Sequence, residues 1–356
     1  MNKKSEKQNI KILVALSGGV DSAVSAALLM EQGYQVEAAF MKNWSKTEGL
    51  LINDCPWLED RRDALRVAAH LGIPFHTFDF EDEYASRVMD YFFQEYAAGR
   101  TPNPDVMCNK EIKFKLLYDK ALSLGFDYLA TGHYAQIKDG ALLRSKDGFK
   151  DQTYFIYNIA PKQLEHIIFP VGGYTKKEIR ELAKKFKLPN ADRKESMGLC
   201  FVGKIRLDEF LKQKLAAKEG DIINSEGKVL GRHQGTSFYT LGQRQGLHIG
   251  GSGPYYVIAK DVIKNTITVS QNAEDASLIT TNVQISGTHW INKPTDLNQK
   301  FQARFRHQQE LQEVILEESE NDQYTVRFTN PQRAAVSGQS LVLYNGQECL
   351  GGGILV

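Results

Sequence analysis

A short run of small and hydroxyl-bearing residues, Ser17-Gly18-Gly19-Val20-Asp21-Ser22, has the composition of a phosphate-binding loop. Its glycines permit a tight turn and a close backbone approach to a ligand. Backbone N–H groups at the start of a following helix favour an anion, and the serine hydroxyls add donors. Asp21 is a candidate for holding Mg²⁺, which prefers few carboxylates together with phosphate oxygens. The run predicts a nucleotide-phosphate site; the alternative is a plain strand-to-helix turn.

Two of the four cysteines, Cys108 and Cys200, have sequence surroundings that suit a reactive thiol. The cysteines stand at positions 55, 108, 200 and 349, with neither a C-x-x-C pair nor a metal-finger spacing. The chain around Cys108 and Cys200 is rich in Pro and Gly, whereas buried structural thiols, the alternative, have apolar surroundings. Cys108 also stands just ahead of an expected helix, whose N-terminus favours a thiolate. Cys349 is expected to pack in a β-like tail, and Cys55 is assigned no role.

The elements that must position these residues alternate between strand and helix up to about residue 190. Expected strands span residues 11–16, 34–40, 73–80 and 127–131, and expected helices span 23–31, 58–71, 83–97, 110–124 and 175–186. Residues 99–109 are expected to form a loop. This alternation predicts an α/β fold with a doubly wound, mainly parallel sheet. Ligands bind such sheets at the carboxyl ends of the strands, where the phosphate-loop run lies.

The pattern changes after about residue 220, where short β-like runs at 266–270, 313–316, 324–328 and 340–344 are separated by turn residues. These runs predict antiparallel strands in a small β-barrel. We therefore expect three domains: a nucleotide-binding catalytic domain at 1–206, a small central domain at 207–275, and a C-terminal β-barrel at 276–356.

Composition narrows the class of protein. The chain has 356 residues, of which 42% are apolar and 24% charged, so whole-chain disorder is excluded. Apolar runs fall short of the roughly 18 residues that span a bilayer, and the start resembles no secretory signal, so a soluble cytoplasmic protein is expected. The net charge of +1 does not exclude nucleic acid, because a local basic face suffices. The histidines form no H-E-x-x-H pair, so no zinc site is predicted.

The phosphate-loop run resembles the PP-loop of ATP pyrophosphatases, which cleave ATP between the α and β phosphates and adenylate an oxygen of the substrate. Over essentially the whole chain, further segments resemble one such family, tRNA-specific 2-thiouridylase. They are FMKNW (40–44), GRTPNPDVMCNKEIKFK (99–115), ATGHYA (130–135), KDQTYF (150–155), GLCFVG (198–203), TLGQRQGL (240–247) and CLGGGI (349–354). The resemblance implies a sulfurtransferase that uses ATP and Mg²⁺ to replace oxygen with sulfur at the 2-position of the wobble uridine in tRNAs for Lys, Glu and Gln.

The resemblance also implies roles for single residues. Cys200 would carry a persulfide, Cys108 would be the partner nucleophile that releases the sulfur and leaves a disulfide, and Asp105 would be a general acid or base. The residues implied in ATP binding are Ala15, Leu16, Ser17, Gly18, Gly19, Val20, Asp21, Ser22, Met41 and Gly132. One departure precedes the second cysteine, where Glu195-Ser196-Met197-Gly198 has glutamate in place of the family's aspartate.

Residues for tRNA binding are assigned partly by the resemblance and partly from spacing. They are Asn103, Pro104, Asp105, His133, Lys150, Asp151, Gln152, Arg304, Arg306 and Gln339. Arg304 and Arg306 stand two apart on an expected strand, so one strand face would present both to a phosphate backbone; an ordinary solvated barrel exterior is the alternative. The target base is expected to be splayed out of the anticodon loop into the pocket.

The implied partners are the tRNA anticodon loop and a cysteine desulfurase or a sulfur-relay protein, with the chain itself a monomer. Two other functions stay open at this point: a PP-loop ligase acting on a small metabolite, and a non-catalytic RNA-binding protein with a vestigial loop. An iron–sulfur cluster held by Cys108, Cys200 and a third ligand is also open, although no close cysteine spacing favours it.

Overall fold

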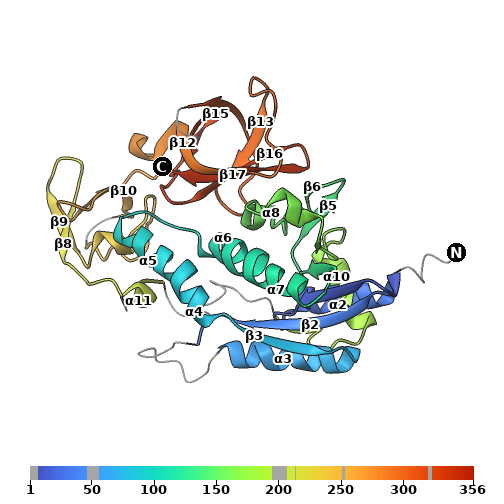
Figure 1. Cartoon of the computed structure of the whole chain (residues 1–356). Coiled ribbons are helices and arrows are strands. Elements are labelled where there is room, and N and C mark those ends of the chain that lie inside the picture. The colour runs from blue at the N-terminus through green and yellow to red at the C-terminus, as the bar shows by residue number, and fades with distance from the viewer. Residues whose placement is uncertain (1–6, 46–55, 195–206, 213, 251–252, 320–322) are drawn as a thin grey trace.

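The structure is a computed structural model that describes residues 7–45, 56–194, 207–212, 214–250, 253–319 and 323–356. Cys55, Cys200 and the run at 195–198 lie outside these described residues. Figure 1 shows three parts: a helix-covered sheet, a small β unit, and a barrel at the C-terminus. No helix among the described residues has both the length and the apolar character needed to cross a membrane.

The first part contains a five-stranded parallel sheet in the order β3-β2-β1-β4-β7. Its strands are β1 (Lys11–Ala15), β2 (Gln35–Lys42), β3 (Phe75–Asp79), β4 (Tyr128–Ala130) and β7 (Ile167–Ile168). Side chains alternate along β1, so Ile12 and Val14 pack with the helices of one face while Leu13 and Ala15 pack with those of the other. The predicted doubly wound parallel sheet is confirmed.

Helices cover both faces of this sheet (Figure 1). One face carries α2 (Val20–Glu31), α3 (Pro56–Leu71) and α10 (Lys176–Lys185). The other face carries α4 (Glu81–Tyr84), η1 (Ala85–Met89), α5 (Asp90–Ala97), α6 (Pro104–Cys108), η2 (Asn109–Leu117) and α7 (Tyr118–Ser123). Short helices α8 (Thr153–Ile156) and α9 (Pro161–Leu164) follow. Both η1 and η2 are π-helical, a wide turn that is frequent at functional sites.

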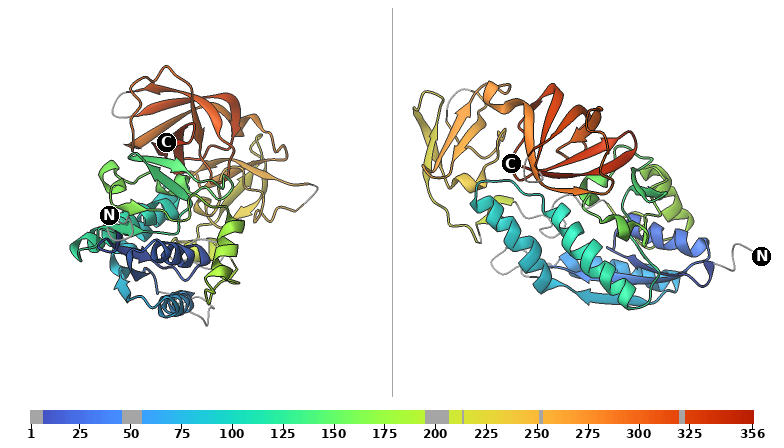
Figure 2. Two further views of the ribbon diagram at one scale, coloured as in Figure 1. Left: turned by 90° about the vertical axis from the view of Figure 1, so that its right-hand side faces the viewer. Right: turned by 45° about the horizontal axis from the view of Figure 1, so that its top comes forward.

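The C-terminal part is a closed antiparallel barrel in the order β12-β15-β14-β13-β16-β17, closed by the pairing of β12 with β17 (Figure 2). Its strands are β12 (Ile279–Trp290), β13 (Phe301–Arg304), β14 (Gln312–Glu318), β15 (Tyr324–Arg333), β16 (Ser340–Asn345) and β17 (Glu348–Leu355). A hairpin from the first part, β5 (Ala135–Lys138) and β6 (Ala141–Arg144), extends this sheet, because β6 pairs with β17. The predicted barrel is confirmed, whereas the hairpin was not predicted.

The middle part has a small sheet in the order β10-β11-β8-β9 around its own core. Its strands are β8 (Gly220–Ile223), β9 (Val229–His233), β10 (Tyr256–Asp261) and β11 (Thr266–Ser270). Strands β8 and β11 are parallel, so the expectation of purely antiparallel pairing is wrong for this pair. The helices here are α11 (Leu207–Leu211), η3 (Thr236–Phe238) and η4 (Ala276–Leu278).

Residues 99–103, between α5 and α6, contact both other parts of the molecule. Lys260 Nζ of β10 donates a hydrogen bond to the Gly99 carbonyl oxygen at 2.7 Å. Gln339 Nε2 of the barrel donates to the Thr101 carbonyl oxygen at 2.7 Å. The segment leads directly into α6, so hydrogen bonds from both other parts hold the chain just before this helix.

Candidate functional site

A cavity of about 320 Å³ lies at the carboxyl ends of β1, β2 and β4. Its lining residues are Ala15, Leu16, Ser17, Gly19, Asp21, Ser22, Phe40, Met41, Asn43, Trp44, Trp57, Asp60, Tyr84, Cys108, Lys113, Thr131, Gly132, His133 and Gln152. The set combines hydroxyl and backbone groups from the loop after β1 with aromatic side chains. Such a mixture of apolar wall and few polar groups suits a small-molecule ligand.

The loop between β1 and α2 is organised by its serines. The Ser22 hydroxyl donates to the Gly19 carbonyl oxygen at 3.1 Å and accepts from the Ser17 backbone N–H at 3.2 Å. Of the ten residues predicted to bind ATP, eight line the cavity; Gly18 and Val20 do not. The loop therefore presents its hydroxyls and the start of α2 to the cavity, as an anion site requires.

Two glycines, Gly18 of the phosphate loop and Gly132 after β4, are needed for backbone packing. Gly18 has φ +79°, and a Cβ there would overlap the Asp60 carbonyl oxygen. A Cβ on Gly132 would lie 2.7 Å from the Ser22 nitrogen. The absent side chain of Gly132 therefore makes room for the phosphate loop, and Gly132 also lines the cavity.

Asp21 is held by two side chains that the sequence did not single out. Lys176 Nζ lies 2.7 Å and 2.9 Å from its two carboxylate oxygens, and the Tyr134 hydroxyl donates to one of them at 2.9 Å. Lys176 is the first residue of α10, whose predicted capping box, Thr175 with Glu178, is confirmed. The carboxylate thus faces the cavity already paired with a cation.

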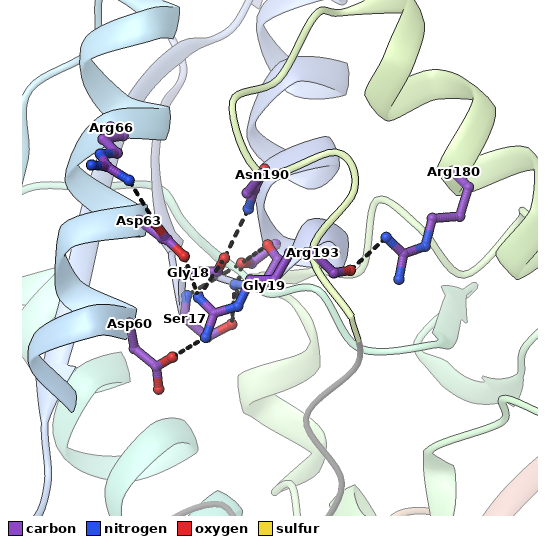
Figure 3. Close-up of polar contacts among 10 residues, drawn as sticks. Ser17, Gly18, Gly19, Asp60, Asp63, Arg66, Arg180, Asn190 and Arg193 are labelled. Carbon is purple, nitrogen blue, oxygen red and sulfur yellow. Dashed lines mark hydrogen bonds and ion pairs between the residues drawn. The ribbon is translucent and has the colours of Figure 1, made fainter. Parts of the chain in front are cut away.

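Behind the loop, two side chains hold the Gly18 carbonyl oxygen (Figure 3). Asn190 Nδ2 donates to it at 2.8 Å and Arg193 Nη1 at 3.2 Å. Arg193 is also paired with Asp60 and, at 2.8 Å, with Asp63, both on α3. Burial raises the pKa of Asp60, and the Arg193 hydrogen bond only partly opposes that shift.

Cys108 is the last residue of α6, 5% exposed, and lines the cavity that the phosphate loop also lines. The helix begins at Pro104, and the Asn103 side chain caps it by accepting from the N–H groups of Asp105 and Val106. The expected loop at 99–109 is therefore wrong after residue 103. The idea that Cys108 sits at a helix N-terminus is corrected as well, because the N-cap residue Asn103 lies five residues earlier and Cys108 is the last residue of α6. Asn103 and Asp105, at the start of α6, do not line the cavity.

The π-helical turn of η2 brings an unpredicted lysine to the same cavity. Lys113 lines the cavity with Cys108, and its Nζ donates to Asn109 Oδ1 at 2.7 Å. His133 Nε2 lies 3.4 Å from Lys113 Nζ, while His133 Nδ1 lies 2.7 Å from the Thr131 hydroxyl. Burial, with Lys113 adding to it, holds the pKa of His133 well below its usual range. His133 is therefore neutral and forms part of the cavity wall.

The predicted tRNA contacts divide into buried and accessible residues. Asp151 is 0% and Arg304 2% exposed, and Arg304 Nη2 lies 2.5 Å from Asp151 Oδ2. Their interpretation as tRNA contacts is corrected, because this ion pair lies in the interior and also holds the Tyr344 hydroxyl. Arg306 follows the end of β13 and is exposed, so the two arginines do not share an outward strand face.

The remaining predicted residues lie in different places. Gln152 lines the cavity and accepts from the Tyr134 N–H at 2.9 Å, and Lys150 precedes it in a half-buried loop. Gln339 holds the 99–103 segment, and Pro104 is buried. Cys349 is fully buried, and burial raises the pKa of its thiol, which fits its expected packing role. Sequence reasoning missed Lys176 and Arg193 because their partners Asp21 and Gly18 stand 155 and 175 positions away. Lys113 lies within the 99–115 segment, but nothing in its spacing singled it out.

Three family models match successive parts of the chain. They are described as tRNA methyl transferase HUP domain over residues 10–204, tRNA methyl transferase PRC-barrel domain over 208–271, and Aminomethyltransferase beta-barrel domain over 280–355. Among solved structures, a 4-thiouridine synthetase in complex with RNA and ATP is 20% identical, covering 57% of this chain and 50% of that one. Its TM-score is 0.38, too low to equate the two folds.

Curated relatives match from end to end. The tRNA-specific 2-thiouridylase MnmA of Pseudomonas entomophila (strain L48) is 46% identical over 97% of this chain and 94% of its own length. The tRNA-specific 2-thiouridylase MnmA of Streptococcus sanguinis (strain SK36) is 45% identical over 99% of this chain and 96% of its own length. With a phosphate loop and a cysteine on one cavity and relatives this similar along its whole length, the chain belongs to the tRNA-specific 2-thiouridylase family.

Proposed function

We propose that this protein is a tRNA-uridine 2-sulfurtransferase, which uses ATP to replace the 2-oxygen of the wobble uridine with sulfur. The observation that carries the proposal is that Cys108 lines the same cavity as Ser17, Gly19 and Ser22 of the phosphate loop. ATP, which activates the uridine, and the Cys108 thiol, which takes part in sulfur transfer, would then both reach the C2 carbon of the same uridine. Methyl transfer, which two family descriptions mention, would leave both the phosphate loop and the thiol without a use.

In the first step, the uracil 2-oxygen attacks the α-phosphorus of ATP, the O–P bond forms, and diphosphate leaves. The loop N–H groups and the hydroxyls of Ser17 and Ser22 would stabilise the phosphate charge, and Met41 would lie against the adenine. Asp105, three residues before Cys108 on α6, would act as general acid or base for the proton of the uracil ring. This step turns a poor leaving group, oxide, into a good one, AMP.

In the second step, the terminal sulfur of a Cys200 persulfide attacks the C2 carbon, and the C2–O bond breaks as AMP leaves. The Cys108 thiolate then attacks the inner sulfur of the persulfide. The S–S bond to the transferred sulfur breaks, its electron pair goes to the thiocarbonyl, and a Cys108–Cys200 disulfide remains. A thiol reductant must reduce that disulfide before the next turnover.

The residues present fit Mg²⁺ carried by the nucleotide. Among the described residues no group of three His, Cys, Asp or Glu side chains could cage a metal. Mg²⁺ needs only one or two carboxylates when phosphate oxygens and water complete its shell, and Asp21 on the cavity wall would supply one. Bound there, the ion neutralises phosphate charge.

We further propose that Arg306 and Lys150 contact the tRNA backbone, that a cysteine desulfurase or a relay protein supplies the sulfur, and that the protein acts as a monomer in the cytoplasm. Arg306 is exposed beyond β13, and Lys150 lies two residues before Gln152 of the cavity wall. Recognition would rest mainly on shape, phosphates and 2′-hydroxyls, as is usual for RNA.

The experiment is thiolation of unmodified tRNA(Glu) transcript with ATP, Mg²⁺, a thiol reductant and a cysteine desulfurase as sulfur source. Thiouridine is detected by retardation in a mercury-containing gel. Wild type should give retarded tRNA, and Cys108→Ser and Cys200→Ser should give none, while Cys349→Ser should retain activity. Absence of product from wild type with proven sulfur delivery would favour a PP-loop ligase for a small molecule. Thiouridine formed by Cys200→Ser would overturn only the assignment of the persulfide to Cys200.

A further inference from the structure

The phosphate loop is held from behind by a polar cluster of four residues, of which only Asp60 lines the cavity. This clamp consists of Asn190 and Arg193, which both donate to the Gly18 carbonyl oxygen, with Asp60 and Asp63 of α3 holding the arginine (Figure 3). We propose that Asn190 and Arg193 are positioning residues for ATP, which orient the Gly18–Gly19 peptide so that its N–H faces the nucleotide. The proposal rests on the proposed use of ATP.

The geometry of the peptide relates the Gly18 carbonyl oxygen to the Gly19 N–H. In a trans peptide the C=O and the N–H point in opposite directions. Because the Gly18 oxygen is turned toward Asn190 and Arg193, the Gly19 N–H is turned away from them. On that side it meets the Ser17 hydroxyl at 3.3 Å, and both Ser17 and Gly19 line the cavity. Holding the Gly18 carbonyl oxygen in place therefore orients the Gly19 N–H, a donor that can bind an anion, toward the cavity.

The glycine conformation makes this hold necessary. Gly18 has φ +79°, and glycine populates positive and negative φ about equally, so the residue itself sets no peptide orientation. Asn190 is 6% exposed, and its Nδ2 bond to Gly18 is buried. The orientation is therefore imposed from outside the loop.

Charge balance indicates that Arg193 acts through the loop and not as a phosphate ligand. Its guanidinium donates to both Asp60 and Asp63, and Arg193 is absent from the residues that line the cavity. The Arg193 backbone is fixed as well, because Arg180 Nη1 of α10 donates to the carbonyl oxygens of Ala191 and Arg193 at 2.8 Å and 2.7 Å. The arginine is a rigid bridge between α3, α10 and the loop.

The Kd for ATP, measured by direct binding, tests the clamp, and the protein's own tryptophans can report the binding. Trp44 and Trp57 line the cavity, so their fluorescence should report nucleotide occupancy without any turnover. Arg193→Gln should raise the Kd for ATP by about tenfold or more, the scale of a lost hydrogen bond from a charged donor. Asn190→Ala should raise it less, and Arg193→Lys, which keeps a cationic donor, should recover part of the affinity.

Arg66→Gln is the matched control. Arg66 Nη1 lies 3.5 Å from Asp63 Oδ1 on the same helix, whereas the Gly18 oxygen is held by Asn190 and Arg193 (Figure 3). Loss of Arg66 therefore removes a guanidinium from the same acidic pair. It should leave the Kd for ATP nearly unchanged. In the thiolation assay, the Arg193→Gln defect should appear mainly in the KM for ATP and shrink at saturating ATP, whereas a misfolded enzyme would not recover.

An unchanged Kd for ATP in Arg193→Gln would overturn the clamp, and so would an equal loss in Arg66→Gln. Thermal unfolding of each variant separates a local effect from loss of folded protein. The binding measurement is independent of the thiolation proposal: ATP binding without thiouridine formation would reject the proposed reaction and still test the clamp.

Discussion

Lys176 at the start of α10 neutralises Asp21 at the start of α2, with Nζ 2.7 Å and 2.9 Å from the two carboxylate oxygens. The Tyr134 hydroxyl, 2.9 Å from the same carboxylate, completes its hydrogen bonding. A triphosphate that enters the cavity therefore meets an Asp21 carboxylate whose negative charge is already neutralised by Lys176. The same carboxylate becomes available for Mg²⁺ only if it exchanges its lysine for the ion.

Lys176→Met should weaken ATP binding most strongly at low Mg²⁺. The variant leaves Asp21 as an unpaired negative charge beside the phosphate loop, which repels the nucleotide. We expect the KM for ATP to rise by about tenfold, corresponding to about 1.4 kcal/mol. Raising the Mg²⁺ concentration should restore much of the affinity, because the ion then neutralises the carboxylate. A rise in the KM for ATP that does not depend on the Mg²⁺ concentration would contradict the claim that Lys176 neutralises Asp21.

Arg304→Met should destabilise the protein rather than act on tRNA binding alone. Removing one partner of a buried ion pair costs about 3–5 kcal/mol, because Asp151 would keep a buried charge without its strongest partner. The measurement is the midpoint of thermal or urea unfolding, and Asp151→Asn in the same chain should recover part of the loss. Arg306→Gln is the comparison: it should weaken tRNA binding with little change in the midpoint, and the reverse pattern would contradict the assignment.

Acid should destabilise the protein through His133. Its folded-state pKa lies below the ordinary value of 6.5, so the unfolded chain binds more protons as the pH falls below about 6.5. Stability is therefore full above that pH and declines below it, by up to about 1.4 kcal/mol per pH unit for one histidine. His133→Gln should flatten the decline of the unfolding midpoint between about pH 6.5 and pH 5. The exposed His248→Asn is the control; an equal flattening there would contradict the account.

Lys260 should make stability rise with pH on the alkaline side. Burial lowers the pKa of Lys260 to about 8, below its ordinary value of 10.5. Between these values the unfolded chain binds more protons, so the folded state gains stability as the pH rises from about 8 toward 10. Lys260→Met should remove that contribution, whereas Lys264→Met on the exposed turn nearby should not. Equal slopes for wild type and Lys260→Met would contradict the prediction.

Local features of the fold could be predicted from the sequence because they depend on neighbouring residues. The Thr175–Glu178 capping box, the strand at Thr266–Ser270 and the glycine-containing loop after β1 are set by spacing within one turn or one strand. The alternation of strand and helix was also sufficient to predict the parallel sheet, since each buried strand carries its own apolar pattern.

Long-range partners could not be predicted. Arg304 and Asp151 are 153 positions apart, so the arginine spacing indicated an exposed strand face where the fold places a buried ion pair. Two other features could not be predicted for the same reason: the pairing of the β5–β6 hairpin with β17, and the approach of Arg193 to Gly18. In each case the local sequence gives no sign of which distant group the residue or strand meets.

The most direct test of the central claim follows the uracil oxygen. A tRNA(Glu) transcript labelled with ¹⁸O at uracil O2 is thiolated under single-turnover conditions, and the AMP released is analysed by mass spectrometry. The account predicts one ¹⁸O in each AMP, formed in equal amount with thiouridine, because the oxygen leaves bonded to the α-phosphorus. Unlabelled AMP alongside thiouridine would contradict adenylation of the uracil oxygen.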